Sequence, residues 1–309
     1  MPGPEITPDA MRDTMDEGKA EDAPGTPPGA PALPADPSPP ASPLAASPRL
    51  KARKARTARS VLALMLREMS STYGRSPGGY AWSLLEPVGA VVAITMITVL
   101  GLRIRSPSIG VSFPLFYATG VLPFLMYQRN VGKIATAISY ARGLLRYPAV
   151  TYTDAIIARF FVQALTHCMV FVIVMGAMLL FLDHRVTPEF PPVLLSLLMA
   201  ASLGLGVGVL NAYLFPVFPV WKSAWTIFTA PLFFVSTIFY TYEELPEAGK
   251  AVLWYNPLVH VVGMMRRGIY DVYDATWVSP TYVFGVSGIT AAMGFILLGR
   301  YYRYIVNQE

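Results

Sequence analysis

The chain has 309 residues, of which 54% are hydrophobic and only 14% are charged, and its formal net charge is +5. Soluble domains carry about 25% charged residues, so this composition predicts an integral membrane protein. The single cysteine, Cys168, excludes an intramolecular disulfide and any multi-cysteine metal site. Three scattered histidines form no paired metal motif, so we expect no metal ion in this chain.

Residues 1–50 differ in composition from the rest, because they hold 13 of the 28 prolines together with eight acids and three bases. Such a segment cannot bury enough apolar surface to offset chain entropy, which predicts a disordered acidic tail. The basic run KARKARTAR follows at 51–59. A basic run can bind nucleic acid, but its position just before the apolar segments favours anionic lipid headgroups as the partner, with no nucleic acid.

Residues 51–81 join this basic segment to an amphipathic stretch, which we expect to lie as a helix in the plane of the inner leaflet. Pro77 and the glycine pair that follows it would then turn the chain into the membrane. Glu86 comes close to the start of the first apolar run, where a carboxylate must face protein, water or headgroups. We interpret it either as a gate or subunit-contact residue or as a side chain that snorkels to the interface.

Residues 82–309 contain six apolar runs long enough to cross a bilayer, since a spanning helix needs about 20 residues. Their approximate bounds are 82–102, 112–129, 154–182, 191–215, 222–242 and 279–299. Six crossings place both termini on one side of the membrane. If that side is the cytoplasm, 14 lysines and arginines lie near the inner face and 6 near the outer face, as the positive-inside rule requires.

The apolar stretch LWYNPLVHVVGMM at 253–265 is too short to cross the membrane as a helix, and this topology places it on the outer side. Asn256-Pro257 would break a helix there, because proline cannot donate a backbone hydrogen bond and disfavours helix in the residue before it. Two interpretations remain open. The stretch is either part of a re-entrant helical hairpin or an amphipathic helix that lies on the outer surface.

Three motifs occur in this order along the chain: RxxxxxYGRSxxGYxWxLLEP at 67–87, YARGLLRYPAVTYTDAIIAR at 140–159, and STIFYTYEELPEAGKAVLWYNPLVHVVGMMRRGIY at 236–270. Together they resemble type-2 ABC export permeases of the capsule polysaccharide and O-antigen family. The first is similar to the family's segment before the first span, the second to its cytoplasmic segment between spans two and three, and the third to its outer region with an NPLxH motif. One departure is Gly263, where many relatives carry an acid.

The resemblance implies an all-α integral membrane protein of the bacterial inner membrane, with six transmembrane helices, an N-terminal interfacial helix, a cytoplasmic coupling helix and a periplasmic re-entrant helical hairpin at 245–272. It also implies a homodimer docked on two copies of a separate ATPase, with polysaccharide as the substrate, with or without a lipid anchor, and with periplasmic export partners. The chain contains no GxxxxGK[ST] phosphate loop. We therefore expect no enzyme activity here, and we expect ATP and magnesium to bind to the partner ATPase.

The segment between the second and third spans carries apolar side chains although it faces water, which is typical of a partner site. With the resemblance, it is interpreted as a short helix that fits a groove on the ATPase; an inner-leaflet anchor is the alternative. The residues expected to contact the ATPase are Ile138, Tyr140, Arg142, Leu144, Leu145, Arg146 and Tyr147.

Aromatic side chains recur at helical spacing in the second and fifth spans, and aromatic faces can hold sugars weakly in many equivalent positions. We therefore interpret them as lining the channel, although interfacial aromatic belts or ordinary core packing would give the same spacing. The residues concerned are Phe113, Tyr117, Phe124, Tyr127, Trp221, Trp225 and Phe228.

Two further groups follow from the resemblance. Tyr73, Arg75, Tyr80, Trp82 and Glu86 belong to the segment before the first span. Trp254, Tyr255, Asn256, Pro257 and His260 belong to the outer region, where they would shape the turn and could touch sugar or a periplasmic partner.

Three rival functions remain. A type-2 ABC permease for drugs or lipids would share the fold. An ion-coupled carrier would require broken-helix repeats and buried ionisable pairs, which the sequence does not indicate. A membrane glycosyltransferase would require clustered acids with a partner constellation, whereas Glu243, Glu244 and Glu247 have none evident in the sequence.

Overall fold

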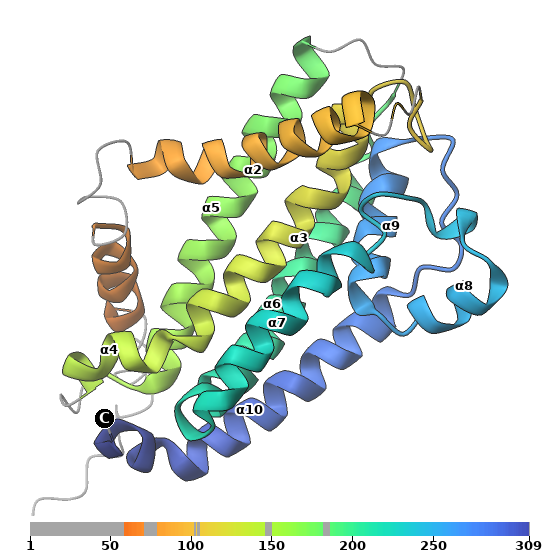
Figure 1. The fold of residues 1–309 in the computed structure, drawn as a ribbon. Coiled ribbons are helices and arrows are strands. Elements are labelled where there is room, and N and C mark those ends of the chain that lie inside the picture. The colour runs from red at the N-terminus through yellow and green to blue at the C-terminus, as the bar shows by residue number, and fades with distance from the viewer. Residues whose placement is uncertain are drawn as a thin grey trace, which may run out of the picture. The chain divides into compact units, whose positions relative to one another are not determined.

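The structure, a computed structural model, describes residues 59–70, 79–101, 103, 106–145, 150–181 and 186–308. These residues form helices joined by turns and short connections, and no strand occurs among them (Figure 1). The all-helical class predicted from the sequence is therefore confirmed for this part of the chain. The predicted acidic tail at 1–50 and the basic run up to residue 58 lie outside the described residues.

The first helix occupies residues 59–70. The elements that follow are α2 (Gly79–Met96), its π-helical continuation η1 (Ile97–Gly101), α3 (Phe113–Ala135), α4 (Ala137–Leu145), α5 (Tyr152–Phe181), α6 (Phe190–Val217), α7 (Pro219–Phe234), the 3-10 turn η2 (Tyr242–Glu244), α8 (Glu247–Leu253), α9 (Pro257–Ile269) and α10 (Pro280–Gln308).

Within the described residues, four helical segments are long and apolar enough to cross a membrane: 81–101, 152–181, 190–217 and 280–302. They match the predicted first, third, fourth and sixth spans. α3 has 23 residues and α7 has 16, and both stand where the second and fifth spans are predicted but fall outside that set. A 16-residue helix rises about 24 Å, less than the hydrocarbon thickness of about 30 Å. The six-span count stays a prediction.

Helix α6 lies between α3 and α10 and is the most buried of the four helical segments that are long and apolar enough to cross a membrane. Its glycines explain the close packing, because a side chain would have no room at these positions. A Cβ at Gly204 would lie 2.6 Å from the Cβ of Asn130 on α3, and a Cβ at Gly206 would lie 2.4 Å from the Ser287 carbonyl oxygen on α10. Small residues at such positions let neighbouring helices approach closely. The sequence therefore makes α6 the centre of the helical core.

The chain leaves the helical conformation earlier than expected in the fifth predicted span. We predicted an apolar run to residue 242, but α7 ends at Phe234, after Pro231, and residues 235–241 are not helical. Thr237 has a φ of 56° there, in the left-handed region that L-residues seldom adopt. Non-helical backbone at membrane depth is tolerated only where protein satisfies its polar groups, and the outer region described below does this.

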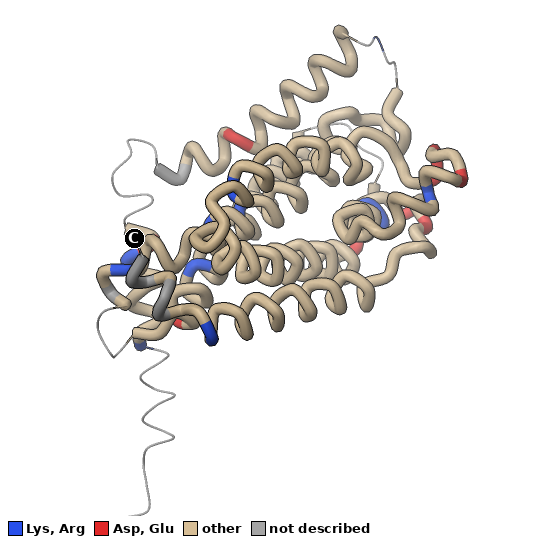
Figure 2. The backbone as a smooth tube through the Cα atoms, turned by 60° about the horizontal axis from the view of Figure 1, so that its bottom comes forward, with Lys and Arg blue, Asp and Glu red and all other residues tan. Residues whose placement is uncertain are grey.

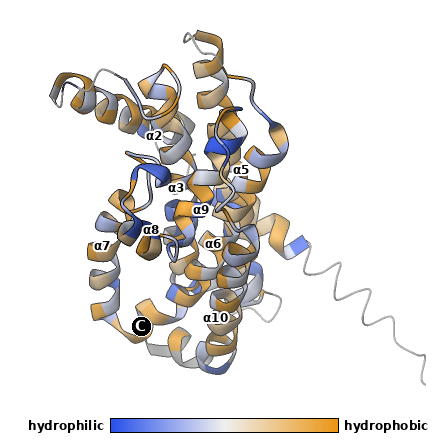
Figure 3. Cartoon of the chain, turned by 90° about the vertical axis from the view of Figure 1, so that its right-hand side faces the viewer, coloured by the Kyte–Doolittle hydropathy of each residue, from blue (hydrophilic) through white to orange (hydrophobic). Residues whose placement is uncertain are grey.

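The two ends of the helical core carry different elements. The helix at 59–70, α4 and the C-terminal end lie at one end, and α8 and α9 lie toward the other (Figure 1). Charged residues gather toward these ends and are sparse along the long helices (Figure 2). Hydrophilic residues are dense around α8, whereas the long helices are mostly hydrophobic (Figure 3). This distribution is typical of a protein that crosses a bilayer.

Candidate functional site

A groove of about 670 Å³ lies between the C-terminal half of α3 and residues 222–230 of α7. Its volume falls within the range of about 300–1,000 Å³ that is usual for ligand sites. The wall combines three bases, one tryptophan and several amide or hydroxyl groups. The lining residues are Gln128, Arg129, Gly132, Lys133, Thr136, Phe215, Lys222, Trp225, Thr226, Thr229 and Ala230.

Helix α7 supplies the aromatic and hydroxyl part of this wall. The hydroxyls of Thr226 and Thr229 donate to the carbonyl oxygens of Lys222 and Trp225, at 3.1 and 2.8 Å. Because each hydroxyl proton is used within the helix, the hydroxyl oxygens keep lone pairs that can accept hydrogen bonds from a ligand. A ligand with hydroxyl groups and apolar C–H faces would match both the threonines and the Trp225 ring.

Helix α2 reaches the groove through an ion pair. Glu86 Oε1 contacts Arg129 Nη2 of α3, and the two side chains are each 44% exposed. Of the other residues predicted before the first span, Trp82 is exposed on α2, and Tyr80 is helical. Tyr73 and Arg75 lie outside the described residues, as does the side chain of Tyr80. Glu86 thus contacts another helix of this chain, and both interpretations of it, a gate or subunit-contact residue and a snorkelling side chain, stay predictions.

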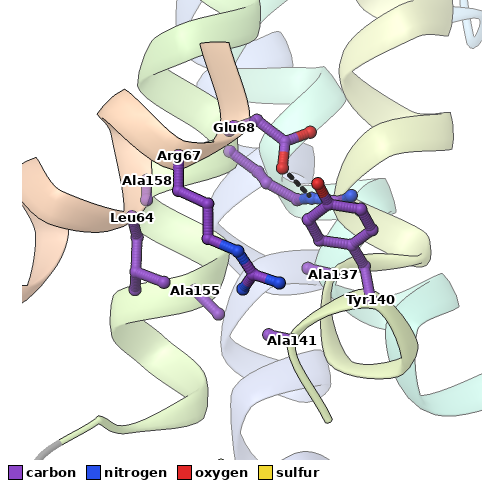
Figure 4. A pocket seen from close by; sticks show the side chains of 9 residues that line it. Leu64, Arg67, Glu68, Ala137, Tyr140, Ala141, Ala155 and Ala158 are labelled. Atoms are coloured by element: carbon purple, nitrogen blue, oxygen red, sulfur yellow. Dashed lines mark hydrogen bonds and ion pairs between the residues drawn. The ribbon is translucent and has the colours of Figure 1, made fainter. Parts of the chain in front are cut away.

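A second cluster of charges fastens the helix at 59–70 to α5 and the C-terminal end of α3 (Figure 4). Arg159 of α5 pairs with Glu68 at 3.2 Å, and both side chains are buried. Arg159 Nη1 also donates to the carbonyl oxygen of Lys133 at 2.9 Å and to the Thr136 hydroxyl at 3.1 Å. A buried charge needs such partners, because removing one member of a buried ion pair leaves the other charge uncompensated, at a cost of about 3–5 kcal/mol.

The predicted coupling helix is α4, and its apolar side is less open than expected. Ile138 and Leu145 are buried and belong to one core cluster with Ile156 of α5 and Leu298 of α10. The expectation that both side chains form an exposed patch is therefore wrong, because the chain's own core covers them. Tyr140 is 41% exposed, and the Arg159 guanidinium lies 4.0 Å from its ring centroid.

The remaining predicted coupling residues are only partly described. The Arg142 side chain is half-buried, whereas the side chain of Leu144 and all of Arg146 and Tyr147 lie outside the described residues. Gly143 is exposed, and a Cβ there would meet no atom within 4 Å. The exposed part of α4 thus centres on Tyr140 and Gly143.

The aromatic residues predicted to line a channel divide into two groups. Tyr117, Phe124 and Tyr127 of α3 are buried in the core of this chain. Phe124 lies 5.0 Å from Phe233 of α7, measured between ring centroids. These residues therefore join α3 to α7 and its continuation rather than facing open space.

The other aromatics are more open. Trp225 lines the groove, and Trp221 lies beside it with ring centroids 6.2 Å apart. Phe228 is 62% exposed, and Phe113 is half-buried at the start of α3. Trp225 is thus the predicted aromatic that the structure brings to the groove wall.

The outer region holds its predicted residues in specific bonds. Asn256 caps α9 by accepting the Leu258 N–H at 3.1 Å, and its amide donates to the Val235 carbonyl at 3.1 Å. Pro257 takes the first position of α9, where its missing N–H has no cost. Trp254 is half-buried and Tyr255 is exposed. Asn256 therefore links α9 to the non-helical end of α7.

His260 is fully buried in α9, with a hydrogen bond on each ring nitrogen. Nδ1 accepts the Ser279 N–H at 3.2 Å, so Nε2 carries the proton and donates to the Trp254 carbonyl at 2.8 Å. Burial lowers the pKa of His260, and the bond to Trp254 opposes that shift. The ring is therefore neutral at pH 7 and holds the turn before α9 in place.

Arg266 is a structural residue that the sequence analysis counted only as an outer base. Its side chain is 1% exposed, and it donates to the Tyr240 and Ile238 carbonyl oxygens at 2.7 and 3.0 Å. Burial lowers the pKa of Arg266 to about 10, so it keeps its charge at neutral pH. The guanidinium thus satisfies two carbonyl groups of the non-helical segment at 235–241. A basic pair inside an otherwise apolar stretch, VVGMMRRG, was the available signal.

The glycine that departs from the family motif is explained by its neighbours. A Cβ at Gly263 would lie 2.6 Å from the Trp277 ring and 2.9 Å from Val278. The Trp277 indole N–H donates to Glu243 at 2.8 Å, and the same carboxylate accepts from the Tyr273 hydroxyl. In this chain the Trp277 ring therefore occupies the space that a side chain at residue 263 would need.

The four long apolar helices and the charged residues toward the two ends define a multi-pass α-helical membrane protein, with a basic groove between α3 and α7. Residues 59–270 match the ABC-2 type transporter family, and because that match covers most of the chain, this protein belongs to that family. It is therefore a membrane subunit of a transport system.

Similar proteins agree with this assignment. The chain is 28% identical to the polysialic acid transport protein KpsM of Escherichia coli over 77% of this chain and 92% of that protein. It is 24% identical to the capsule polysaccharide export inner-membrane protein CtrC of Neisseria meningitidis serogroup A over 80% of this chain and 92% of that protein. A shorter match, 32% identical over 29% of this chain and 34% of the relative, is to the O-antigen export system permease protein RfbA of Myxococcus xanthus.

Proposed function

We propose that this chain is the permease subunit of an ATP-driven ABC exporter that moves polysaccharide across the bacterial inner membrane. The proposal is supported by family membership and by the export functions that the names of its relatives state. The observation that carries it is the groove, where a tryptophan face, threonine oxygens with free lone pairs and three bases share one wall. Sugars present the C–H faces and hydroxyl groups that such a wall can bind.

The proposed topology has six spans, α2, α3, α5, α6, α7 and α10, with both termini in the cytoplasm. It is supported by the excess of bases near one end and by the position of the C-terminal end beside α4 (Figure 1). α8 and α9 would then form the re-entrant pair at the periplasmic mouth, where periplasmic export partners could dock. In this scheme residues 1–50 form a separate cytoplasmic tail, and the helix at 59–70 lies along the inner leaflet.

The proposed assembly is a homodimer. None of the 16 residues of α7 is buried within this chain, although Phe228 and Ile227 on it are large and apolar. Trp225, Leu232 and Phe233 pack partly against the core, and the rest of the helix surface has lipid, a translocation path or a second copy of the chain against it. Pairing two copies around the α3–α7 groove would enclose a path for a polymer, with or without a lipid anchor.

The proposed ATPase contact is the exposed part of α4, and the ATPase would bind the ATP and magnesium. Gly143 offers a sharp test, because a side chain there meets nothing in this chain. Gly143→Trp should leave the protein in the membrane but abolish co-purification of the ATPase and export. Gly143→Ala is the matched control and should retain both. Retention of the ATPase by Gly143→Trp would place the contact elsewhere.

The function itself is tested by deleting the gene in the bacterium that carries it and measuring polysaccharide on the cell surface and inside the cell. We expect surface polysaccharide to be lost and polymer to accumulate inside, with both effects reversed by the full chain. Unchanged surface polysaccharide together with increased sensitivity to a drug would instead identify the drug-exporting rival that shares this fold.

A further inference from the structure

The charges around the α3–α7 groove are not balanced within the described residues. Arg129 is paired with Glu86, and Arg159 is paired with Glu68. Lys133 also lines the groove, and the Glu68 carboxylate that acts on its charge is already bound to Arg159.

Lys222 lines the groove from α7 and makes no ion pair with an acid in the part of the chain that the structure describes; the same holds for Lys133. Within the described residues, two cations therefore line one groove without an ion-pair partner of their own. Cations near membrane depth are costly unless a partner compensates them, so the groove suits a ligand that carries negative charge.

The Glu86–Arg129 ion pair is more exposed than the Arg159–Glu68 pair, and this exposure determines how easily an anionic ligand can displace Glu86. Both side chains are 44% exposed, whereas the side chains of Arg159 and Glu68 are 7% and 8% exposed. An exposed ion pair contributes about 0–1 kcal/mol, so an incoming anion can replace one of its members at little cost. Arg129 lies on the groove wall, and Glu86 reaches it from another helix, α2.

We propose that Glu86 is a built-in substitute for an acidic group of the exported molecule. It holds Arg129 at the edge of the groove until a carboxylate or phosphate, bound by Lys133 and Lys222, takes its place at Arg129. The proposal rests on the export function above, and it adds an anion site and its internal competitor. The acidic group has two sources, carboxylates along the polymer or the phosphate that joins a polymer to its lipid.

The site is tested with the full-length chain in phosphatidylcholine nanodiscs, by calorimetric titration with three probes. Tetragalacturonate carries carboxylates without lipid, dihexanoyl phosphatidylglycerol carries a lipid phosphate without a polymer, and maltotetraose is a neutral sugar of matched length. We expect at least one anionic probe to bind more tightly than maltotetraose and to weaken as salt is raised. Tetragalacturonate binding would assign the site to the polymer, and phosphatidylglycerol binding to the lipid phosphate.

Two sets of variants then test the residues. The double change Lys133→Gln with Lys222→Gln should weaken binding of the anionic probe about tenfold or more, since each lysine supplies a charge-assisted bond. Glu86→Gln should tighten it by up to about fivefold, because the competitor for Arg129 is lost. Lys250→Gln, on α8 and outside the groove lining, is the control and should change nothing.

The proposal is overturned if neither anionic probe binds more tightly than maltotetraose, or if Glu86→Gln and the double lysine variant leave the affinity of the anionic probe unchanged. The Glu86→Gln result is a gain, so poor folding cannot imitate it, and an unfolding temperature is recorded for each variant. The two proposals fail separately. If the purified protein binds the anionic probe as expected but gene deletion leaves surface polysaccharide unchanged, the anion site stands and the export assignment is wrong. If gene deletion abolishes surface polysaccharide but the binding tests fail, the export assignment stands and the anion site is wrong.

Discussion

Helices α7 and α9 stand close together in the sequence but have opposite environments. α7 is rich in Trp, Phe and other apolar residues, yet none of its residues is buried. α9 carries a histidine and two arginines, yet eleven of its 13 residues are buried. Because lipid is as apolar as a protein core, apolar residues in a membrane protein do not mark the interior. Polar residues mark it instead, since they must find partners inside the protein.

The largest effect is expected where α9 supports the end of α7. Arg266→Ala would leave the Ile238 and Tyr240 carbonyls without their donors, and we expect the free energy of unfolding to fall by about 3 kcal/mol. Thermal unfolding in detergent measures this. Arg267→Ala is the matched control, because the Arg267 side chain is exposed, and its cost should stay within about 0.5 kcal/mol. Equal losses in the two variants would contradict the structural role of Arg266.

A smaller effect is expected for Gly263→Ala, in which the new methyl group meets the Trp277 ring. Overpacking of this kind costs about 1–3 kcal/mol. The loss should shrink when Trp277→Leu is already present, because the space is then free. A double-mutant cycle on unfolding temperatures measures this coupling, and additive losses would show that Trp277 is not the obstacle.

On α7, in contrast, function should change more than stability. Trp225→Ala is expected to lower the free energy of unfolding by about 1 kcal/mol, because the half-buried ring packs against the core. It should slow polysaccharide export by about two- to tenfold if the ring binds sugar, a range set by the strength of aromatic contacts. Ile227→Ala is the control, since Ile227 is exposed on the same helix and does not line the groove. An export rate that is equal in the two variants would remove Trp225 from the path.

The smallest effect is a pH dependence that α9 has and α7 lacks. Because the folded-state pKa of His260 is lowered by burial, its neutral form is favoured in the folded protein. Its contribution to stability is fully present above the unfolded pKa of about 6.5 and is lost as the pH falls below that value. The unfolding temperature of His260→Gln should therefore vary less between pH 7.5 and about pH 5.5 than that of the wild type. Identical profiles would show that His260 does not titrate in this range.

The sequence predicted the helical class and four of the long apolar helices, because apolar runs of about 20 residues have few alternatives. It did not predict the end of α7 at Phe234, since the segment after it stays apolar and its unwinding depends on Arg266, nearly thirty residues later. The site was partly foreseen: Trp225 and Glu86 were named, whereas Lys133 and Lys222 were counted only as signals of orientation. Their meeting in one groove depends on how α3 packs against α7, which spacing within each helix does not encode.

The bonds from Arg266 to residues 238 and 240 also determine how α7 can move. They fasten the segment after α7 to α9, and near the other end of the helix the Trp221 indole N–H donates to Asn211 of α6 at 3.0 Å. With both ends held, we expect α7 to shift together with α6 and α9 rather than alone. A displacement of either neighbour would then change the width of the groove beside Lys222 and Trp225.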